Sequence, residues 1–336
     1  QKIVYLVNQC NIPSRSIVAV TFTNKAAKEM NSRVNKLLTK NKSFGLTVST
    51  FHNLGLRIIR SEVKTLGFKN GFSILDQEDC RNLLKELMIR HSDLDNELLD
   101  TLLTTISSWK NSLLEPNQIL NSSNSNGEKS IALLYAEYQR SLKAYNAVDF
   151  DDLIMIPVLL LRTHSEILAK WRSKIKYLLV DEYQDTNLSQ YELIRILVDE
   201  RQALTVVGDD DQSIYAWRGA RPENLLQLQK DFPRLKIIKL EQNYRSTSRI
   251  LRAANKLIDN NPHLIKKELW SDLGLGEPLR FISCENEESE CERVVNEIID
   301  MRLRRRCKYN DFAILYRGNY QACLLYTSPS PRDVEE

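Results

Sequence analysis

One pair of acidic residues, Asp181 and Glu182, directly follows a run of apolar residues, 177–180. Such a run predicts a buried strand, so both carboxylates would stand at the carboxyl edge of a parallel sheet, where such folds bind ligands. In a nucleoside triphosphatase the first carboxylate holds Mg²⁺, usually through water, and the adjacent one orients or deprotonates the attacking water. We interpret Asp181 and Glu182 in these roles; the plainer alternative is an acidic turn after a buried strand.

A second apolar run, 204–207, leads into a polar loop that is followed by closely spaced aromatic residues. Gln212 lies in the loop, and Tyr215, Trp217 and Arg218 follow within four positions of one another. Aromatic rings stack on unpaired bases for about 1–3 kcal/mol each whatever the base, and arginine holds phosphate. Gln212 could therefore contact nucleotide phosphates while the aromatic residues contact DNA. The alternative is that Tyr215 and Trp217 are core residues that cap the sheet.

Two further strand ends carry residues that could contact DNA. Phe22 ends the run 16–22 and could be buried or could stack on a base, while Asn24 is a plausible helix cap. Thr50 ends the run 46–50 and could bond a DNA phosphate; a lone histidine such as His52 is more often structural than catalytic. The candidate DNA-binding residues are Phe22, Thr23, Asn24, Thr50, His52, Phe150, Tyr215, Trp217 and Arg218.

Arg245 follows the β-rich run 236–240 and is placed to reach across a domain boundary to a γ-phosphate. Its neighbour Tyr244 could stack on adenine. A salt-bridged surface arginine is the alternative for Arg245. The acidic residues around Phe150 open a predicted helix, where they complement the helix dipole. That alone explains them, so a DNA role for Phe150 needs outside support.

The elements that must position these residues alternate between two patterns. Each short β-rich run precedes a stretch with helical periodicity, which predicts an α/β fold with a parallel sheet covered on both faces. The predicted strand–helix pairs are 16–22 with 25–38, 46–50 with 51–60, 175–180 with 189–198, 204–207 with 222–230, and 236–240 with 248–259.

Leucine-rich helical stretches replace this alternation between about residues 60 and 148. The helices expected there are 80–89, 98–109 and 131–144, with no convincing strand, which predicts an all-helical insertion. After about residue 275, a strand at 278–283, a helix at 288–303 and a strand at 311–316 predict the start of a second α/β unit. Residues 326–336 break the pattern, and we expect them to be a non-native tail.

The composition is typical of a folded protein, and its net charge is small. The chain has 336 residues, a formal net charge of +3 and 27% charged residues, so any basic surface must be local. Its six cysteines show no CxxC spacing, which argues against a zinc site or a disulfide framework and favours a reducing cytoplasm. The apolar stretch 153–161 is too short to cross a bilayer. Gln1 is not an initiator methionine, and we expect the chain to begin inside a longer protein.

Taken in order, these segments closely resemble the Rep/UvrD/PcrA-type helicases of superfamily 1. The resemblance extends from about residue 17 to 320, in the strings VTFTNKAAKEM, VSTFHNLGLRII, VDFDDLI, YLLVDEYQDTNLSQYELI, TVVGDDDQSIYAWRGARPENL, KLEQNYRSTSRIL and FAILYRGN. It implies an ATP-dependent helicase or translocase that uses ATP and Mg²⁺ to move 3′ to 5′ along single-stranded DNA.

The resemblance also implies roles for individual residues. By position, Asp181 and Glu182 match the Mg²⁺ and water-activating carboxylates, and Gln212 and Arg245 match the phosphate sensors. Tyr244 matches the adenine-stacking residue. The matching DNA contacts are Phe22, Phe150, Tyr215, Trp217 and Arg218.

The family's layout implies four regions in this chain. Residues 1–55 and 149–242 would form the first RecA-like motor domain, 56–148 its helical accessory insertion, and 243–325 the beginning of a second RecA-like domain. The implied partners are single-stranded DNA, duplex/single-strand junctions and replication or repair proteins. A monomer or weak dimer, with no membrane association, is expected.

One departure from the family pattern matters. Such motors need a glycine-rich loop, GxxxxGK[ST], whose amides and lysine hold the phosphates. The nearest match, residues 127–130, follows a polar loop rather than a strand. In the family the loop lies just upstream of the first matching segment, and motifs of the second motor domain also lie downstream. We therefore expect truncation at both ends, negligible hydrolysis by this polypeptide alone, and an active parent protein.

Two alternatives of other classes stay open. The first is an ATPase-dead module that binds single-stranded DNA or a partner, although such a module has no physical need for Asp181, Glu182 and Arg245. The second is a metal-dependent nuclease that uses Asp181, Glu182 and Asp185. It lacks a second carboxylate cluster for a two-metal site.

Overall fold

The computed structural model of the chain describes residues 1–90, 98–198, 202–318 and 320–323. The chain divides into two compact units. Gln1–Glu241 and Lys256–Glu268 form the first unit, and Gln242–Asn255 with Leu269–Glu336 form the second. None of the helices in the described ranges is long and apolar enough to span a bilayer.

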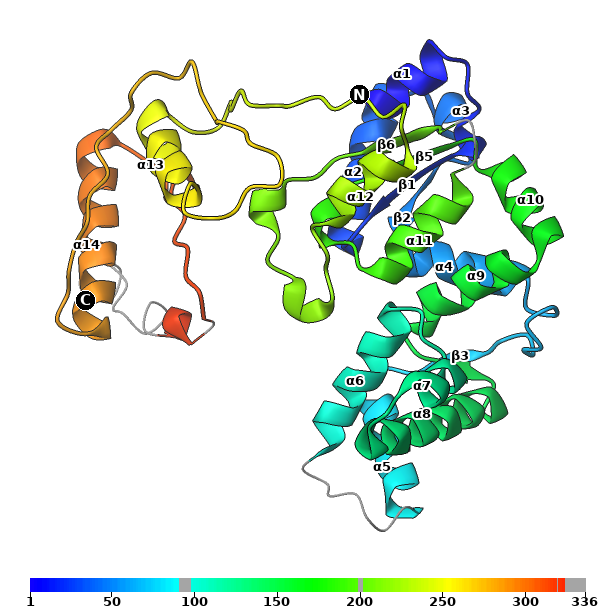
Figure 1. The fold of residues 1–336 in the computed structure, drawn as a ribbon. Coiled ribbons are helices and arrows are strands. Elements are labelled where there is room, and N and C mark those ends of the chain that lie inside the picture. The colour runs from blue at the N-terminus through cyan, green and yellow to red at the C-terminus, as the bar shows by residue number, and fades with distance from the viewer. Residues whose placement is uncertain (91–97, 199–201, 319, 324–336) are drawn as a thin grey trace. The chain divides into compact units, whose positions relative to one another are not determined.

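A parallel sheet organises the first unit, as the sequence predicts (Figure 1). Its strands within the described residues, in spatial order, are β2 (Thr47–Thr50), β1 (Ile17–Thr21), β5 (Tyr177–Val180) and β6 (Leu204–Val206). In register, Thr21 lies beside Thr50, and Val180 lies between Val20 and Val206. Parallel pairing brings all four carboxyl ends to one edge. The α/β prediction is confirmed.

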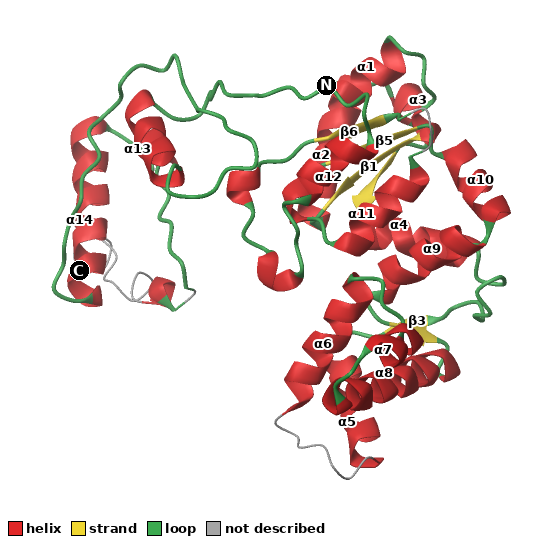
Figure 2. Ribbon diagram, viewed as in Figure 1, coloured by secondary structure: helices red, strands yellow, loops and turns green. Residues whose placement is uncertain are grey.

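Helices cover both faces of this sheet (Figure 2). Ala19 and Leu179 face the side packed by α1 (Lys2–Asn8) and α2 (Asn24–Leu37). Val18, Val20, Leu178 and Val180 face the larger core on the other side. The helices that contribute to the larger core are α4 (Phe51–Ser61), α9 (Asp152–Thr163), α10 (Ser165–Lys174), α11 (Leu188–Leu197) and α12 (Asn224–Asp231). Burial on both faces explains why the two central strands, β1 and β5, are apolar at nearly every position.

The leucine-rich region forms a helical group with its own core. Its helices are α5 (Gln77–Arg90), α6 (Leu99–Asn111), α7 (Pro116–Ser122) and α8 (Asn126–Ala144). The expectation of no strand is wrong, because β3 (Ser73–Ile74) pairs in parallel with β4 (Ala147–Val148) where the chain enters and leaves the group. Two residues are too few to show the alternation that identifies a strand.

Three predicted strands do not form. Strand structure is absent from residues 236–240, 278–283 and 311–316, all of which the structure describes. The short 3-10 turn η6 (Tyr309–Asp311) overlaps the start of the last range. A strand needs a neighbour to share its backbone hydrogen bonds. Outside the named strands, the described residues offer only an isolated bridge between Gln242 and Trp270. Helices α13 (Ser248–Ile258) and α14 (Glu287–Arg305) form close to their predicted bounds. Residues 326–336, the predicted non-native tail, lie outside the described residues.

Candidate functional site

Two polar loops lie side by side at the carboxyl edge of the sheet, one after β5 and one after β6. The backbone N–H of Asp181 donates to Val20 O at 2.9 Å, so the chain extends the strand pairing by one residue. Val207 N then donates to Val180 O at 2.8 Å, and Tyr183 N donates to Val207 O at 2.9 Å. These bonds fix the acidic loop against the loop that carries Gln212.

Asp181 and Glu182 occupy a sharp turn at the end of β5. Burial and the neighbouring Glu182 carboxylate raise the pKa of Asp181, against a backbone hydrogen bond that lowers it. Glu182 is exposed and has φ of 51°, a left-handed conformation that is uncommon for residues other than glycine. Such backbone strain is concentrated at functional sites.

Gln184 connects the two loops, and sequence reasoning missed it. Its side chain is buried, donates from Nε2 to Glu182 Oε2 at 2.9 Å, and accepts at Oε1 from the backbone N–H of Asp209 at 2.9 Å. Gly208 permits this approach, since a Cβ there would lie 2.9 Å from Gln184 Oε1. A glutamine in a polar loop gives no sign in the sequence that it is buried.

The β6 loop extends this connection to the aromatic residues. Gln212 Nε2 donates to Asp209 Oδ2 at 2.7 Å within the 3-10 turn η4 (Asp210–Gln212). The next 3-10 turn, η5 (Ala216–Arg218), holds Trp217, which is 72% exposed, beside Tyr215, which is 37% exposed; their ring centroids are 6.3 Å apart. The alternative that these rings cap the core is therefore wrong. The side chain of Arg218 is outside the described part of the chain.

The remaining strand ends differ in what they present. Phe22 is half-buried and packs edge-to-face on the buried Phe51, with ring centroids 5.8 Å apart. Thr23 caps α2 by accepting from Ala26 N at 3.1 Å. The prediction that Asn24 caps this helix is wrong, because Asn24 is its first helical residue and the Thr23 hydroxyl makes the capping bond.

Thr50, His52 and Phe150 lie near one another. Thr50 caps α4, accepting from Asn53 N at 3.3 Å, and the His52 ring meets Phe150 edge-on with centroids 6.0 Å apart. Burial lowers the pKa of His52, so the imidazole is neutral at pH 7. Phe150 is 53% exposed, and its ring is available for stacking.

Comparison with known proteins now decides the family. A family model described as the UvrD/REP helicase N-terminal domain matches residues 1–233, and one described as the UvrD-like helicase C-terminal domain matches residues 238–330. This chain belongs to the UvrD/REP helicase family.

Individual relatives agree with this assignment. The chain is 53% identical over 321 residues to the ATP-dependent DNA helicase Rep of Escherichia coli K12, which covers 96% of the chain and 48% of that protein. It is 41% identical over 323 residues to the ATP-dependent DNA helicase PcrA of Bacillus subtilis, covering 96% and 43%. The chain thus spans about half the length of the curated relatives it matches. The family resemblance inferred from the motifs is confirmed.

The sheet edge of this UvrD/REP family member carries oxygen atoms of the kind that bind Mg²⁺. Mg²⁺ prefers carboxylate, hydroxyl and water oxygens and usually keeps several waters. In addition to the Asp181 carboxylate, this edge has the buried Thr21 Oγ1 and Asp185 Oδ1, which find no hydrogen-bond partner among the described residues. Within the described residues, the group with three carboxylates at ligand spacing is Asp209–Asp211 and does not include Asp181. A Mg²⁺ ion at Asp181 would therefore take most of its ligands from water and nucleotide.

Tyr244 and Arg245 belong to the second unit. Asn243 Oδ1 accepts from the backbone N–H groups of Arg245 and Ser246 at 2.9 and 2.8 Å, which holds this turn in shape. Tyr244 is 79% exposed. Arg245 is also exposed, and its guanidinium makes no ion pair with any described residue.

Proposed function

We propose that the chain is part of an ATP-dependent DNA helicase that couples ATP hydrolysis to 3′–5′ movement along single-stranded DNA. The supporting observation is the hydrogen-bond chain from Glu182 through Gln184 and Asp209 to Gln212. It links the acidic loop to the loop that continues into the exposed Tyr215 and Trp217. In this proposal, a change at one loop would reach the other through these hydrogen bonds.

The proposed chemistry divides among the residues of these loops. Mg²⁺, when bound with ATP, would neutralise charge that develops on the phosphates. Asp181 would hold that ion, largely through water, and Glu182 would orient and deprotonate the attacking water. Gln212 and Arg245 would contact the γ-phosphate, and Tyr244 would stack on the adenine. The raised pKa of Asp181 fits a carboxyl that is poorly compensated until a cation arrives.

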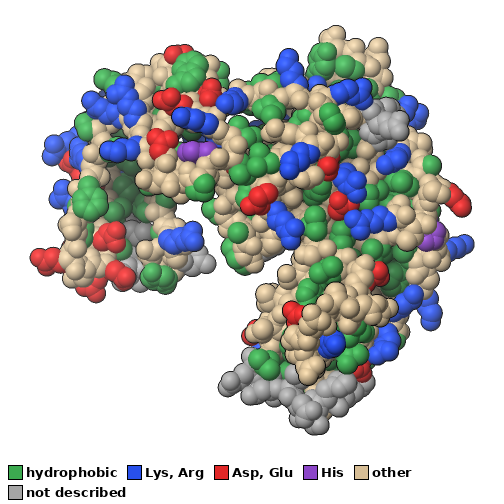
Figure 3. Space-filling model, viewed as in Figure 1, with side chains coloured by type: hydrophobic (Ala, Val, Ile, Leu, Met, Phe, Trp, Pro, Cys, Tyr) green, Lys and Arg blue, Asp and Glu red, His purple; other side chains and the backbone are tan. Residues whose placement is uncertain are grey.

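The proposed DNA track depends on aromatic stacking more than on net charge. On the face in Figure 3, Lys and Arg side chains are scattered among acidic and apolar ones rather than gathered in one basic patch. Trp217, Tyr215 and Phe150 offer exposed rings that can stack on bases whatever their identity. Phe22 is less accessible and would contribute by positioning. Thr23, Asn24, Thr50, His52 and Arg218 stay proposed DNA contacts.

The proposal also retains the expected layout, partners and location. Residues 1–55 and 149–242 would form the first motor domain, 56–148 its accessory insertion and 243–325 the start of the second. Duplex/single-strand junctions and replication or repair proteins would be partners of a monomer or weak dimer. A cytoplasmic location is supported by six cysteines that are all free thiols.

DNA-stimulated ATP hydrolysis by the full-length gene product tests this function. We expect single-stranded DNA to stimulate turnover, and Glu182→Gln to abolish the stimulation while DNA affinity is retained. Single-strand binding without any turnover by the unaltered protein would instead favour the ATPase-dead binding module. Metal-dependent cleavage of DNA that is lost in Asp181→Ala would favour the nuclease.

A further inference from the structure

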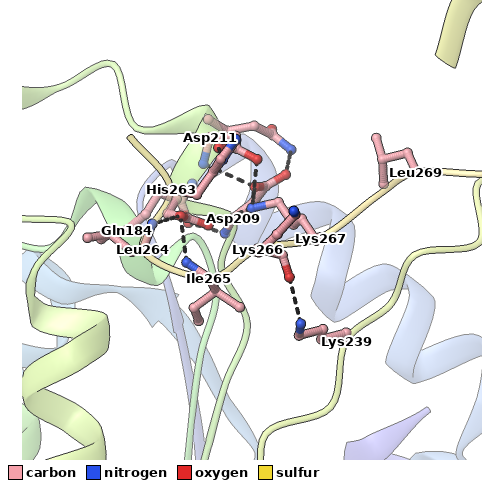
Figure 4. Close-up of polar contacts among 12 residues, drawn as sticks. Gln184, Asp209, Asp211, Lys239, His263, Leu264, Ile265, Lys266, Lys267 and Leu269 are labelled. Carbon is pink, nitrogen blue, oxygen red and sulfur yellow. Dashed lines mark hydrogen bonds and ion pairs between the residues drawn. The ribbon is translucent and has the colours of Figure 1, made fainter. Parts of the chain in front are cut away.

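A single lysine, Lys267, lies among three consecutive carboxylates of the β6 loop (Figure 4). Its Nζ is 2.6 Å from Asp209 Oδ1 and 2.9 Å from Asp211 Oδ2, and it also contacts Asp210 Oδ1. Lys267 and Asp210 are 57 residues apart along the chain, and both lie in the first unit. The contact therefore ties a distant segment to the loop that bears Gln212.

Backbone groups next to Lys267 strengthen the attachment. The N–H groups of Leu264 and Ile265 donate to Asp210 Oδ2 at 3.0 and 3.2 Å. His263 Nδ1 lies 3.1 Å from Asp211 Oδ1. Each acidic side chain thus has its own partner in the segment 263–267, and Asp209 faces Gln212 as well as Lys267.

Charge explains why the loop needs this lysine. Three adjacent carboxylates with little exposure repel one another, and an ammonium at their centre offsets that repulsion. The side chains of Asp210 and Asp211 are 6% and 13% exposed, and that of Lys267 is 18% exposed, so solvent screens them only in part. Burial opposes both charges, yet the mutual contacts lower the pKa of Asp210 and raise that of Lys267. Asp210 and Lys267 are therefore both charged near neutral pH.

A metal ion is not required at this cluster. Its three ligand oxygens lie within 4.8 Å of one another, a spacing that a cation could bridge. Lys267 supplies the positive charge at that place, so the acidic cluster is satisfied by the protein itself.

We propose that Lys267 is a positioning residue for ATP hydrolysis, which acts through Asp209 to hold Gln212 in place. Asp209 accepts from Lys267 with Oδ1 and from Gln212 Nε2 with Oδ2, while its backbone N–H donates to Gln184. The lysine thereby fixes the carboxylate that orients the proposed phosphate sensor. This inference rests on the proposed function.

The first experiment measures DNA-stimulated ATP turnover of the full-length gene product with Lys267→Met, which keeps most of the side-chain volume and removes the charge. We expect kcat to fall roughly ten- to a hundredfold, because small misplacements of a reacting assembly cost rates of that order. Lys267→Arg should restore most of kcat. The matched control is Lys266→Met, because the exposed Lys266 side chain makes no hydrogen bond or ion pair with the described residues.

A second experiment separates positioning from general stability. If Lys267 acts through Gln212, the double variant Lys267→Met/Gln212→Ala should turn over ATP as slowly as Gln212→Ala alone. Multiplication of the two losses would overturn the inference, as would wild-type kcat in Lys267→Met or failure of Lys267→Arg to restore activity. An unaltered protein without DNA-stimulated turnover would instead overturn the proposed function itself. The two failures are therefore distinguishable.

Discussion

The ammonium of Lys110, on α6, lies 2.6 Å from Asp149 Oδ2, just before α9, and 2.8 Å from Oδ1 of Asp152, the first residue of α9. Lys110 is fully buried, and Gln139 Oε1 also accepts from it at 3.0 Å. Burial disfavours the ammonium, but the two carboxylates outweigh that effect and raise the pKa of Lys110. Asp149 and Asp152 thus join the helical group to α9, and the helix dipole alone does not explain them.

Lys110→Met should strongly destabilise the chain. The substitution keeps the side-chain volume but leaves two buried carboxylates without their cation, which costs roughly 3–5 kcal/mol in comparable cases. Urea unfolding followed by circular dichroism measures the change in the free energy of unfolding. The exposed Lys143, on the same insertion, supplies the control Lys143→Met, which should change stability little. A loss in Lys110→Met no greater than in this control would contradict the account.

Glu62 should make stability depend on pH in the acid range. Burial opposes ionisation, but bonds from Lys170 at 2.6 Å, Ser61 at 2.9 Å and Trp171 at 3.1 Å lower the pKa of Glu62 below its usual 4.5. A lowered carboxyl pKa gives stabilisation that is complete above the unfolded-state value and is lost as pH falls. The contribution of Glu62 to the free energy of unfolding should therefore be lost as pH falls below about 4.5.

The comparison variant for this prediction is Glu62→Gln. At pH 7 it should be less stable than the unaltered chain by about 1–2 kcal/mol, a modest value because solvent screens the half-exposed Lys170. The difference should shrink as pH falls from 5 to 3 in thermal unfolding experiments. Glu166→Gln, at an exposed position of α10, should show no such convergence. A difference that stays constant with pH would refute the assignment.

The sequence predicts the sheet and most of its helices because burial on both faces leaves a strong apolar pattern. It wrongly predicts a strand at 278–283, where Phe281 is 96% exposed and no neighbouring strand is described. The sequence pattern of a segment shows that it could form a strand, whereas the strand forms only when a second segment elsewhere in the chain pairs with it. Within the site, Asp181 and Gln212 can be singled out from the sequence because each comes after a predicted strand. Gln184 and Lys267 do not, because a buried polar side chain in a loop has no periodic signature.

Trp217→Ala in the full-length protein should weaken binding of single-stranded DNA. Loss of one stacked base costs about 1–3 kcal/mol, or roughly five- to 150-fold in Kd. Fluorescence anisotropy with a labelled oligonucleotide measures this change, and DNA unwinding should fall as well. Phe44→Ala is the control, because Phe44 is 84% exposed but precedes β2, at the opposite edge of the sheet. Equal DNA affinity in Trp217→Ala and the unaltered protein would remove the stacking role.

Arg245→Ala should suppress ATP turnover while sparing DNA affinity. An arginine that stabilises the transferring phosphoryl group contributes on the order of 10³–10⁵ in kcat. The exposed Arg252 on α13 provides a control of the same residue type, and Arg252→Ala should retain turnover. Single-turnover hydrolysis with saturating DNA measures the effect. Parallel losses of turnover and DNA binding in Arg245→Ala would indicate a structural role for the residue.

Gln184→Leu tests the connection between the two loops directly. Leucine fills a similar volume but leaves the backbone N–H of Asp209 without its 2.9 Å partner and frees the Glu182 carboxylate. An unsatisfied buried group costs about 1–3 kcal/mol, so a fall in melting temperature is expected. Turnover should fall further than this instability explains, because Glu182 and Gln212 lose their common support.

Gln184→Glu separates the loss of the bond from Asp209 N–H from the loss of the bond to the Glu182 carboxylate. Glutamate can still accept from Asp209 N–H with one oxygen, but its second oxygen would face the Glu182 carboxylate and repel it. We expect the thermal stability of Gln184→Glu to rise as pH falls, because protonation of one of two facing carboxyls restores a donor, and to be lost again as pH rises. ATP turnover, measured at the same pH values, should rise and fall together with the thermal stability. A variant with flat profiles in both measurements would show that the Glu182–Gln184 bond does not connect the acidic loop to the loop of Gln212.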